Sequence, residues 1–189
     1  NEDIALMRTI PGMTIINPCD DIEAKQAVKA AYEMEGPVYL RFGRLATPII
    51  NSEDYKFEIG KGVKLKEGTD VTIVATGLMV AASLEAAKNL EADGINAEVI
   101  NIHTIKPLDG DIIVESAKKT GKVITVEEHS IIGGLGSAVC DCLSAKYPVS
   151  VSKIGVEDVY GHSGPAVELL KEFGLDAEGI YNKIKKIMA

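Results

Sequence analysis

The sequence lacks the features of a membrane protein and of a nucleic-acid-binding protein. It has no apolar run of about 18 residues, the length that a transmembrane helix needs, and no recognisable signal peptide. Its 28 acidic residues outnumber its 20 basic residues, and the formal net charge is −8. Lysine and arginine are scattered rather than clustered, so a phosphate backbone would be repelled. We therefore expect neither a membrane nor a nucleic acid as a partner.

Cysteine is also scarce, because the chain has three, and an odd number cannot pair completely. Cys140 and Cys142 lie two positions apart on a predicted helix, which places them about 200° apart around its axis. Side chains in that arrangement can neither form a disulfide nor chelate one metal ion together. Buried, reduced thiols are typical of cytoplasmic proteins, and we predict that location.

The sequence does have a regular alternation of predicted strands and helices. Its 189 residues, 46% of them hydrophobic, are enough for one large domain, or for one domain and part of another. Strands that alternate with helices predict a parallel sheet covered on both faces. The sequence starts with Asn1 rather than methionine, in what resembles the middle of an element. We therefore expect a section of a longer protein.

Residues 1–44 predict a remnant of a second α/β domain. Thr14–Asn17 and Val38–Phe42 are predicted strands, and between them Asp20 should cap a helix, with Glu23 completing a capping box. The inward face of that helix should hold apolar residues at helical spacing: Ala27, Val28, Ala31 and Met34. Two strands and one helix cannot close a core. We therefore expect this part to be only conditionally ordered, with unpaired sheet edges.

Residues 45–61 show no period and predict a linker, whereas residues 62–189 predict a doubly wound, mostly parallel α/β domain. The predicted strands are Val71–Thr76, Ala97–Ile102, Val123–Val126 and Val149–Ile154. The predicted helices are Leu78–Asp93, one capped by Asp109 and ending at Gly121, Leu135–Lys146, one capped by Ser163, and a last one opened by Asp176.

A glycine-rich turn, Gly133–Ser137, lies between a predicted strand and a predicted helix, where a phosphate could approach a helix N-terminus. The dinucleotide pattern is not met, because position 139 is Val. Glu127 and Glu128 just upstream would also repel a pyrophosphate. We interpret the glycines as a tight turn with close packing of helix on strand.

The three histidines, His103, His129 and His162, lie on separate loops near predicted strand ends, where α/β folds place ligands. Glu128 and His129 form a candidate acid–base pair. No serine or cysteine elbow accompanies them, and the histidines lack metal-ligand spacing. We favour a role for His103 and His129 in ordering loops or interfaces, and we predict no catalytic residue, cofactor-binding residue or metal ligand in this sequence.

Two arginines are candidates for binding a phosphate group. Arg44 lies just past the carboxyl end of the second predicted strand, where a guanidinium can hold a phosphate bidentately. Arg41 is the second candidate, although side chains three apart on a strand point to opposite faces. From local chemistry alone, a salt bridge at a surface or interface explains Arg44 equally well.

Several segments, taken in order, resemble the transketolase family over nearly the whole chain. They are Glu2–Pro11, Pro18–Asp21, Gly36–Arg44, Thr76-Gly77, Asn101–Asp109, Glu127–His129 with Gly133–Ser137, and Tyr160–Gly164 with Glu168–Leu170. The resemblance implies the end of the family's pyrimidine-binding domain (1–44), a linker (45–61) and its C-terminal domain (62–189).

The resemblance also implies a function. Enzymes of this family use thiamine diphosphate and Mg²⁺ to transfer a two-carbon ketol unit between sugar phosphates of the pentose phosphate pathway. Each active site lies across a homodimer interface. By ungapped count from Pro37, Arg44 matches the family's substrate-phosphate arginine. The Gly-Asp-Gly motif for magnesium and diphosphate and the glutamate that activates the cofactor are absent, so the chain alone should be inactive and bind neither group.

Three alternatives remain open from the sequence. 1-Deoxyxylulose-5-phosphate synthase usually has a proline where this chain has Gly43. The β subunit of a 2-oxoacid dehydrogenase E1 would not need a sugar-phosphate arginine. A non-catalytic assembly subunit would pair with a separate N-terminal section, in a heterotetramer rather than a homodimer.

Overall fold

A computed structural model describes residues 1–189. Fifteen elements follow one another along the chain. The helices are α1 Asp3–Arg8, α2 Asp21–Glu33, α3 Met79–Ala92, α4 Gly110–Thr120, α5 Leu135–Lys146, α6 Ala166–Glu172 and α7 Ala177–Met188. The strands are β1 Thr14–Ile16, β2 Val38–Leu40, β3 Val63–Lys66, β4 Val71–Ala75, β5 Ala97–Asn101, β6 Thr104–Lys106, β7 Lys122–Ser130 and β8 Ser150–Val156.

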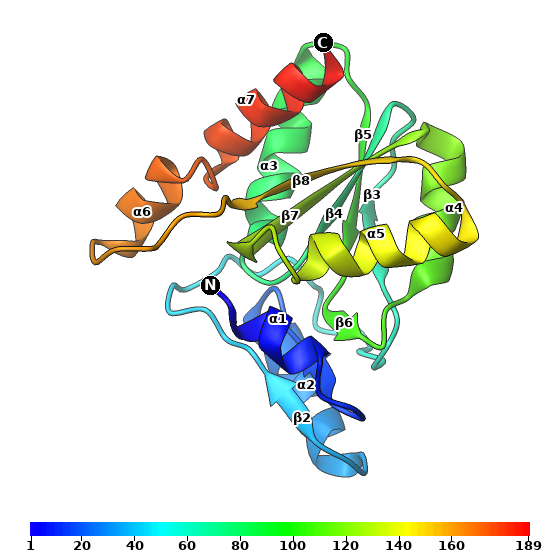
Figure 1. Ribbon diagram of the computed structural model, residues 1–189, viewed down its shortest axis with the longest axis vertical. Helices are drawn as coiled ribbons and strands as arrows, with labels where there is room; N and C mark the ends of the chain where they lie inside the picture. The colour runs from blue at the N-terminus through cyan, green and yellow to red at the C-terminus, as the bar shows by residue number, and fades with distance from the viewer.

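The large sheet has the order β3-β5-β4-β7-β8. Strands β4, β5, β7 and β8 run parallel, and β3 is an antiparallel edge. Helices α3 and α7 cover one face, and α4 and α5 cover the other (Figure 1). Alternate residues of β4 serve the two faces, because Ile73 belongs to the core under α3 whereas Val74 belongs to the core under α4 and α5. The predicted doubly wound, mostly parallel fold is confirmed.

A small sheet of order β2-β1-β6 joins the N-terminal unit, residues 1–44, to the rest of the chain. Strand β1 is parallel to β2 but antiparallel to β6, with Ile15 opposite Lys106 and Ile16 opposite Thr104. Figure 1 shows this unit (blue to cyan) packed beneath the large sheet. The prediction of a remnant with half a core was therefore wrong about packing, because β6 closes one edge of the small sheet.

The hydrophobic core is also shared between the two parts. Ile4 and Ile15 are fully buried and belong to the same cluster as Val74, Ile100 and Ile113 of the large sheet and its helices. Burial of an isoleucine side chain stabilises a fold by about 1.5–3 kcal/mol. The N-terminal unit therefore draws its core from residues that lie far along the chain.

The linker, residues 45–61, is fastened by helix α2, and the missed strand β3 follows it. The Asp20 carboxylate accepts hydrogen bonds from Glu23 N (2.8 Å), as an N-cap, and from Ile50 N (2.8 Å) and Asn51 N (2.7 Å). Gln26 donates to Tyr55 O. The sequence did not predict β3 or β6, because each is short and is held by a strand that is distant in the sequence, β5 or β1.

Helix starts were predicted well where a side chain caps them and poorly elsewhere. Asp20, Asp109 and Asp176 cap α2, α4 and α7 as expected. Ser163 does not cap α6. That helix starts after Pro165, which has extended backbone angles and makes no capping hydrogen bond.

The expected apolar face of α2 is also wrong at one position, because Val28 is exposed while the acidic Glu23 is buried. The reason is that Glu23 accepts hydrogen bonds from Cys19 N, Tyr55 Oη and Asn101 Nδ2. None of the helices is both long and apolar enough to span a membrane.

Candidate functional site

The order of the strands places a crevice between β4 and β7. Strand β5 lies on one side of β4, and the chain then returns to place β7 on the other side. In open α/β sheets, ligands bind outside the carboxyl ends of the strands at such a reversal. Leu78 follows β4 and Glu128 lies near the end of β7, so both reach this point.

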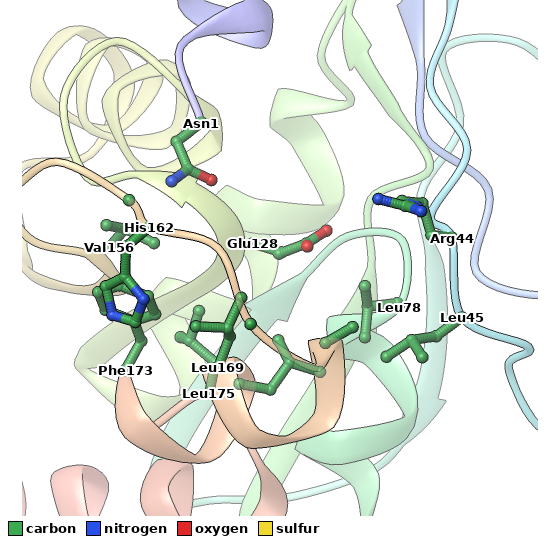
Figure 2. A pocket seen from close by; sticks show the side chains of 14 residues that line it. Asn1, Arg44, Leu45, Leu78, Glu128, Val156, His162, Leu169, Phe173 and Leu175 are labelled. Carbon is green, nitrogen blue, oxygen red and sulfur yellow. The ribbon is translucent and has the colours of Figure 1, made fainter.

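A hollow of about 260 Å³ opens at this crevice. Its floor is apolar and consists mainly of Leu78, Val156, Leu169, Leu170, Phe173 and Leu175. Its polar lining residues include Asn1, Arg44, Glu128 and His162 (Figure 2). An apolar hollow with a few convergent polar groups is the usual form of a small-molecule site.

Arg44 and Glu128 point into the hollow from opposite sides, as Figure 2 shows. Arg44 comes from the loop after β2, is exposed, and takes part in none of the ion pairs of the chain. Its guanidinium is therefore available to a ligand. The sequence prediction of Arg44 as a phosphate-binding residue is compatible with this position.

Arg41 is placed differently, because its guanidinium is already occupied. Its Nε donates to Asp3 Oδ2 (2.8 Å), its Nη1 to Glu128 Oε2 (3.3 Å), and its Nη2 to the Glu128 carbonyl (2.9 Å). Burial opposes both charges, but the mutual hydrogen bonds and attraction hold the pKa of Asp3 below, and that of Arg41 above, its usual value. The arrangement favours Arg44 over Arg41 as the anion-binding group.

The reason given for separating the two arginines was wrong. Strand β2 ends at Leu40, so Arg41 and Arg44 do not lie on opposite faces of one strand. They separate because Arg41 turns towards α1 and β7, whereas Arg44 turns into the hollow.

The glycine-rich turn before α5 is closed by the chain itself. The fully buried Glu127 carboxylate accepts hydrogen bonds from Leu135 N (2.6 Å) and Gly136 N (2.8 Å) at the helix N-terminus. A side chain at Gly134 would overlap that carboxylate. The prediction of a tight turn with close packing is confirmed, and Glu127 occupies the position that a phosphate would need.

Glu127 also has an unusual ionisation equilibrium. Burial raises its pKa to about 7, although the hydrogen bonds from Gly136 and Leu135 and the charges of Lys153 and Arg8 favour the ionised form. The group therefore titrates near neutral pH without being exposed to a ligand.

The expected acid–base pair of Glu128 and His129 does not form. His129 is fully buried, its Nδ1 donates to Ser130 O (2.7 Å), and its Nε2 accepts a hydrogen bond from Ala5 N of α1 (3.3 Å). These bonds fix one neutral tautomer, and burial lowers the pKa of the ring. His129 thus orders the contact between α1 and β7, the role that we favoured.

The other two histidines differ in exposure. His103 is buried against the Phe57 ring, with a centroid distance of 4.4 Å, and burial lowers its pKa. His162 lines the hollow, and an exposed ion pair with Glu172 (3.0 Å) raises its pKa. No group of three or more His, Cys, Asp or Glu side chains is arranged to hold a metal ion.

The sequence reasoning did not identify Glu128 or Leu78 as lining residues. Leu78 follows β4 and Glu128 lies near the end of β7, the two strands at the reversal, but that reversal is visible only from the strand order. Glu128 could have been marked by its place beside the buried Glu127, because adjacent residues of a strand face opposite sides.

Comparison with known proteins places both parts of the chain in one family. Residues 60–180 match the transketolase C-terminal domain, and residues 1–49 match the transketolase pyrimidine-binding domain. A putative transketolase C-terminal section of Methanocaldococcus jannaschii is 46% identical over 99% of this chain and 59% of its own length. A 6-deoxy-6-sulfo-D-fructose transketolase subunit of Clostridium sp. (strain MSTE9) is also 46% identical, over 95% of this chain and 56% of its own length.

A solved structure shares the fold closely. It is a split-gene transketolase, described as an inactive β4 tetramer, with a TM-score of 0.93 and 50% sequence identity. The match covers 99% of this chain and 60% of the solved one. This chain thus spans a little over half the length of these relatives.

Proposed function

This chain belongs to the transketolase family, as a C-terminal section, and we propose that the complete enzyme transfers a two-carbon ketol unit between sugar phosphates with thiamine diphosphate and Mg²⁺. The observation that carries the proposal is the position of Arg44. It lies at the hollow with no ion pair of its own. By ungapped count from Pro37 it also falls at the position that the family resemblance assigns to the arginine for the substrate phosphate. We propose that Arg44 binds the phosphate of the sugar, with the pentose phosphate pathway as its setting.

The residues of this chain do not fit the diphosphate of the cofactor. The N-terminus of α5, which has a glycine turn suited to a phosphate, is filled by the Glu127 carboxylate. When bound, thiamine diphosphate supplies the nucleophilic carbon that accepts the ketol unit. We propose that a complementary section of the enzyme holds it together with Mg²⁺, and that this chain contributes the outer, substrate-binding edge of the site.

An assembly of more than one subunit follows from the same proposal. The solved relative is the product of a split gene, and the Clostridium relative is described as a subunit. We propose that this section works in a homodimer, or in a heterotetramer with an N-terminal section if the enzyme is split. Within it, residues 1–44 would end the pyrimidine-binding domain, 45–61 the linker, and 62–189 the C-terminal domain.

Replacement of Arg44 in the complete enzyme tests the proposal. A charge-assisted hydrogen bond to phosphate contributes about 1.5–3 kcal/mol, so Arg44→Ala should lower kcat/KM for a phosphorylated ketose donor roughly 10- to 150-fold. Hydroxypyruvate, assayed with an unphosphorylated acceptor, should be used at nearly the wild-type rate. Steady-state kinetics with the two donors measures both values.

Arg44→Lys is the matched variant, because it keeps the charge and loses the two-pronged donor geometry. It should recover part of the loss with the phosphorylated donor. Equal damage to both donors by Arg44→Ala would mean that the residue supports the fold or the assembly instead. Condensation of pyruvate with a sugar phosphate, without ketol transfer, would favour the 1-deoxyxylulose-5-phosphate synthase alternative.

A further inference from the structure

Glu128 brings a negative charge into the same hollow that Arg44 enters. Its carboxylate faces Arg44 across the hollow (Figure 2). One oxygen, Oε2, accepts a hydrogen bond from Arg41 (3.3 Å), whereas Oε1 has no partner among the hydrogen bonds of the chain. The side chain is 34% exposed, so Oε1 is open to solvent and to a ligand.

The charges around the hollow nearly balance before a ligand binds. Asp3 and Glu128 are acidic, and Arg41 and Arg44 are basic. Burial lowers the pKa of His129, and the exposed ion pair of His162 with Glu172 lies at the side of the hollow near α6. An anion held by Arg44 must therefore lie near the Glu128 carboxylate, whose charge is offset by the Arg41 guanidinium alone.

The repulsion from Glu128 depends on the charge of that anion. A phosphate monoester has a second pKa near 6, so it carries close to two negative charges at pH 8 and about one at pH 5.5. A sulfonate keeps a single negative charge throughout this range. The Coulomb repulsion between Glu128 and the anion doubles when the anion gains its second charge. In contrast, a free carboxylate oxygen can accept hydrogen bonds from the hydroxyl groups of a sugar.

We propose that Glu128 determines specificity at the Arg44 site by accepting hydrogen bonds from substrate hydroxyl groups and by opposing a doubly charged tail relative to a singly charged one. The proposal rests on the anion-binding role of Arg44 and adds the chemical class of the preferred tail: a sulfonate or a singly protonated phosphate. In this proposal the ion pair with Arg41 holds the Glu128 carboxylate in position at the hollow.

The test compares matched phosphorylated and sulfonated ketose donors on the complete enzyme. Glu128→Gln keeps an oxygen that can accept from Arg41 and removes the charge. At pH 8 it should raise kcat/KM for the phosphorylated donor, relative to the sulfonated donor, by about three- to tenfold. At pH 5.5, where most of the free phosphate carries a single charge, the relative change should become smaller.

Asp3→Asn is the matched control. Asp3 is the other carboxylate that binds Arg41, but it does not line the hollow. This variant should change the ratio of the two donors less than Glu128→Gln does, because the Asp3 carboxylate is held by Tyr39 and Arg41 and does not line the hollow. An equal change in both variants would show that the effect comes from a freed Arg41, and would overturn the proposal.

Phosphorus NMR of a bound sugar phosphate provides a measurement that does not depend on turnover. Removal of a nearby carboxylate stabilises the phosphate dianion, so the pKa of the bound phosphate should be lower in Glu128→Gln than in wild type. Glu128→Asp, which keeps the charge but withdraws it by one methylene, should give a smaller decrease and also serves if the glutamine variant folds poorly.

Different results would contradict the role of Arg44 and the role of Glu128. If Arg44→Ala does not discriminate between donors, the phosphate-binding role of Arg44 is wrong. If Arg44→Ala does discriminate, but Glu128→Gln changes neither the donor ratio nor the pKa of the bound phosphate, the role of Glu128 alone is wrong.

Discussion

Among single residues, the buried ionisable groups have the most closely defined surroundings. Glu127 accepts two backbone hydrogen bonds from α5, and His129 bonds to Ser130 and to α1. The two side chains lie side by side, with His129 Nδ1 3.7 Å from Glu127 Oε2. The His129 contact with α1 stabilises the seam between the N-terminal unit and the large sheet, whereas Glu127 holds the start of α5 against β7. Neither side chain lines the hollow.

Glu127 should make stability depend on pH. Its pKa is about 7 in the folded chain against 4.5 for a free glutamate, so the native state holds a proton that the unfolded state releases. The free energy of unfolding should therefore fall as pH rises from about 4.5 to 7, by about 3 kcal/mol at most, and then level off. Glu127→Gln should lose this decline.

Denaturant titrations of wild type and Glu127→Gln at pH 5 and pH 8 measure how much the free energy of unfolding of each protein changes with pH. The difference between the two changes is the contribution of Glu127, because the other titrating groups are common to both proteins. His103 and His129 have lowered pKa values and act with the opposite sign, because their contribution is lost as pH falls. If wild type and Glu127→Gln change equally between the two pH values, Glu127 is ionised throughout and the assignment of its pKa is wrong.

Side-chain patterns predicted single residues well only where the chemistry is local. Asp20, Asp109 and Asp176 were recognised as caps because each bonds to a backbone N–H three residues ahead. Glu127 and Glu128 were recognised as acidic, but their partners come from α5 and from Arg41, which no local spacing indicates. Contacts between residues distant in the sequence depend on the packed structure.

At the scale of elements, α2 does more than cover the small sheet. Its capping residue Asp20 also holds the backbone of Ile50 and Asn51, and its buried Glu23 reaches Tyr55 and Asn101. The linker has no regular structure over these residues, and its order comes from this helix. The linker is thus a fixed part of the structure between the two sheets.

A comparison of two helix caps measures how much the bonds from Asp20 to the linker contribute to stability. Asp176 caps α7 through Gly179 N alone, so Asp176→Ala should destabilise the chain by about 1 kcal/mol. Asp20→Ala also leaves the Ile50 and Asn51 amides without an acceptor, and should cost about 2–4 kcal/mol. Chemical denaturation of the two variants provides the numbers, and equal losses would show that the linker is held by other contacts.

Most of the long elements were predictable from the sequence, as were the short strands β1 and β2, whereas the short strands β3 and β6 were not. Helix α5 has the predicted bounds, β4 and β5 end one residue earlier than predicted, and α3 is one residue shorter at each end. The missed strands β3 and β6 owe their existence to partners, β5 and β1, rather than to their own pattern. Helix α6 has no buried residue and no capping side chain, which explains why its start was misplaced.

For the whole molecule, the shared core and the β1–β6 pair predict one cooperative unit. Amides of Thr14–Ile16 should exchange with solvent as slowly as those of Val71–Ala75, because both strands are buried and paired on two sides. Amides of α6 should exchange fastest among the helices, since none of its residues is buried. Hydrogen exchange resolved by residue tests this.

If the amides of residues 1–44 exchange rapidly while those of the large sheet are protected, the chain is not one cooperative unit. Residues 1–44 would then be the conditionally ordered remnant expected from the sequence. Ile15→Ala offers an independent measurement. It should lower the free energy of unfolding by about 2–5 kcal/mol and do so in a single transition, because Ile15 lies in the core cluster of the large sheet.

The β1–β6 pair also bears on the order in which the chain folds during its synthesis. Ile15 is made early, but its antiparallel partner Lys106 leaves the ribosome only after the linker and strands β3, β4 and β5. Until then, Ile4 and Ile15 cannot reach the core that buries them. Strand β1 must therefore wait for the later strand β6, and the large sheet begins to form while Ile4 and Ile15 are still exposed.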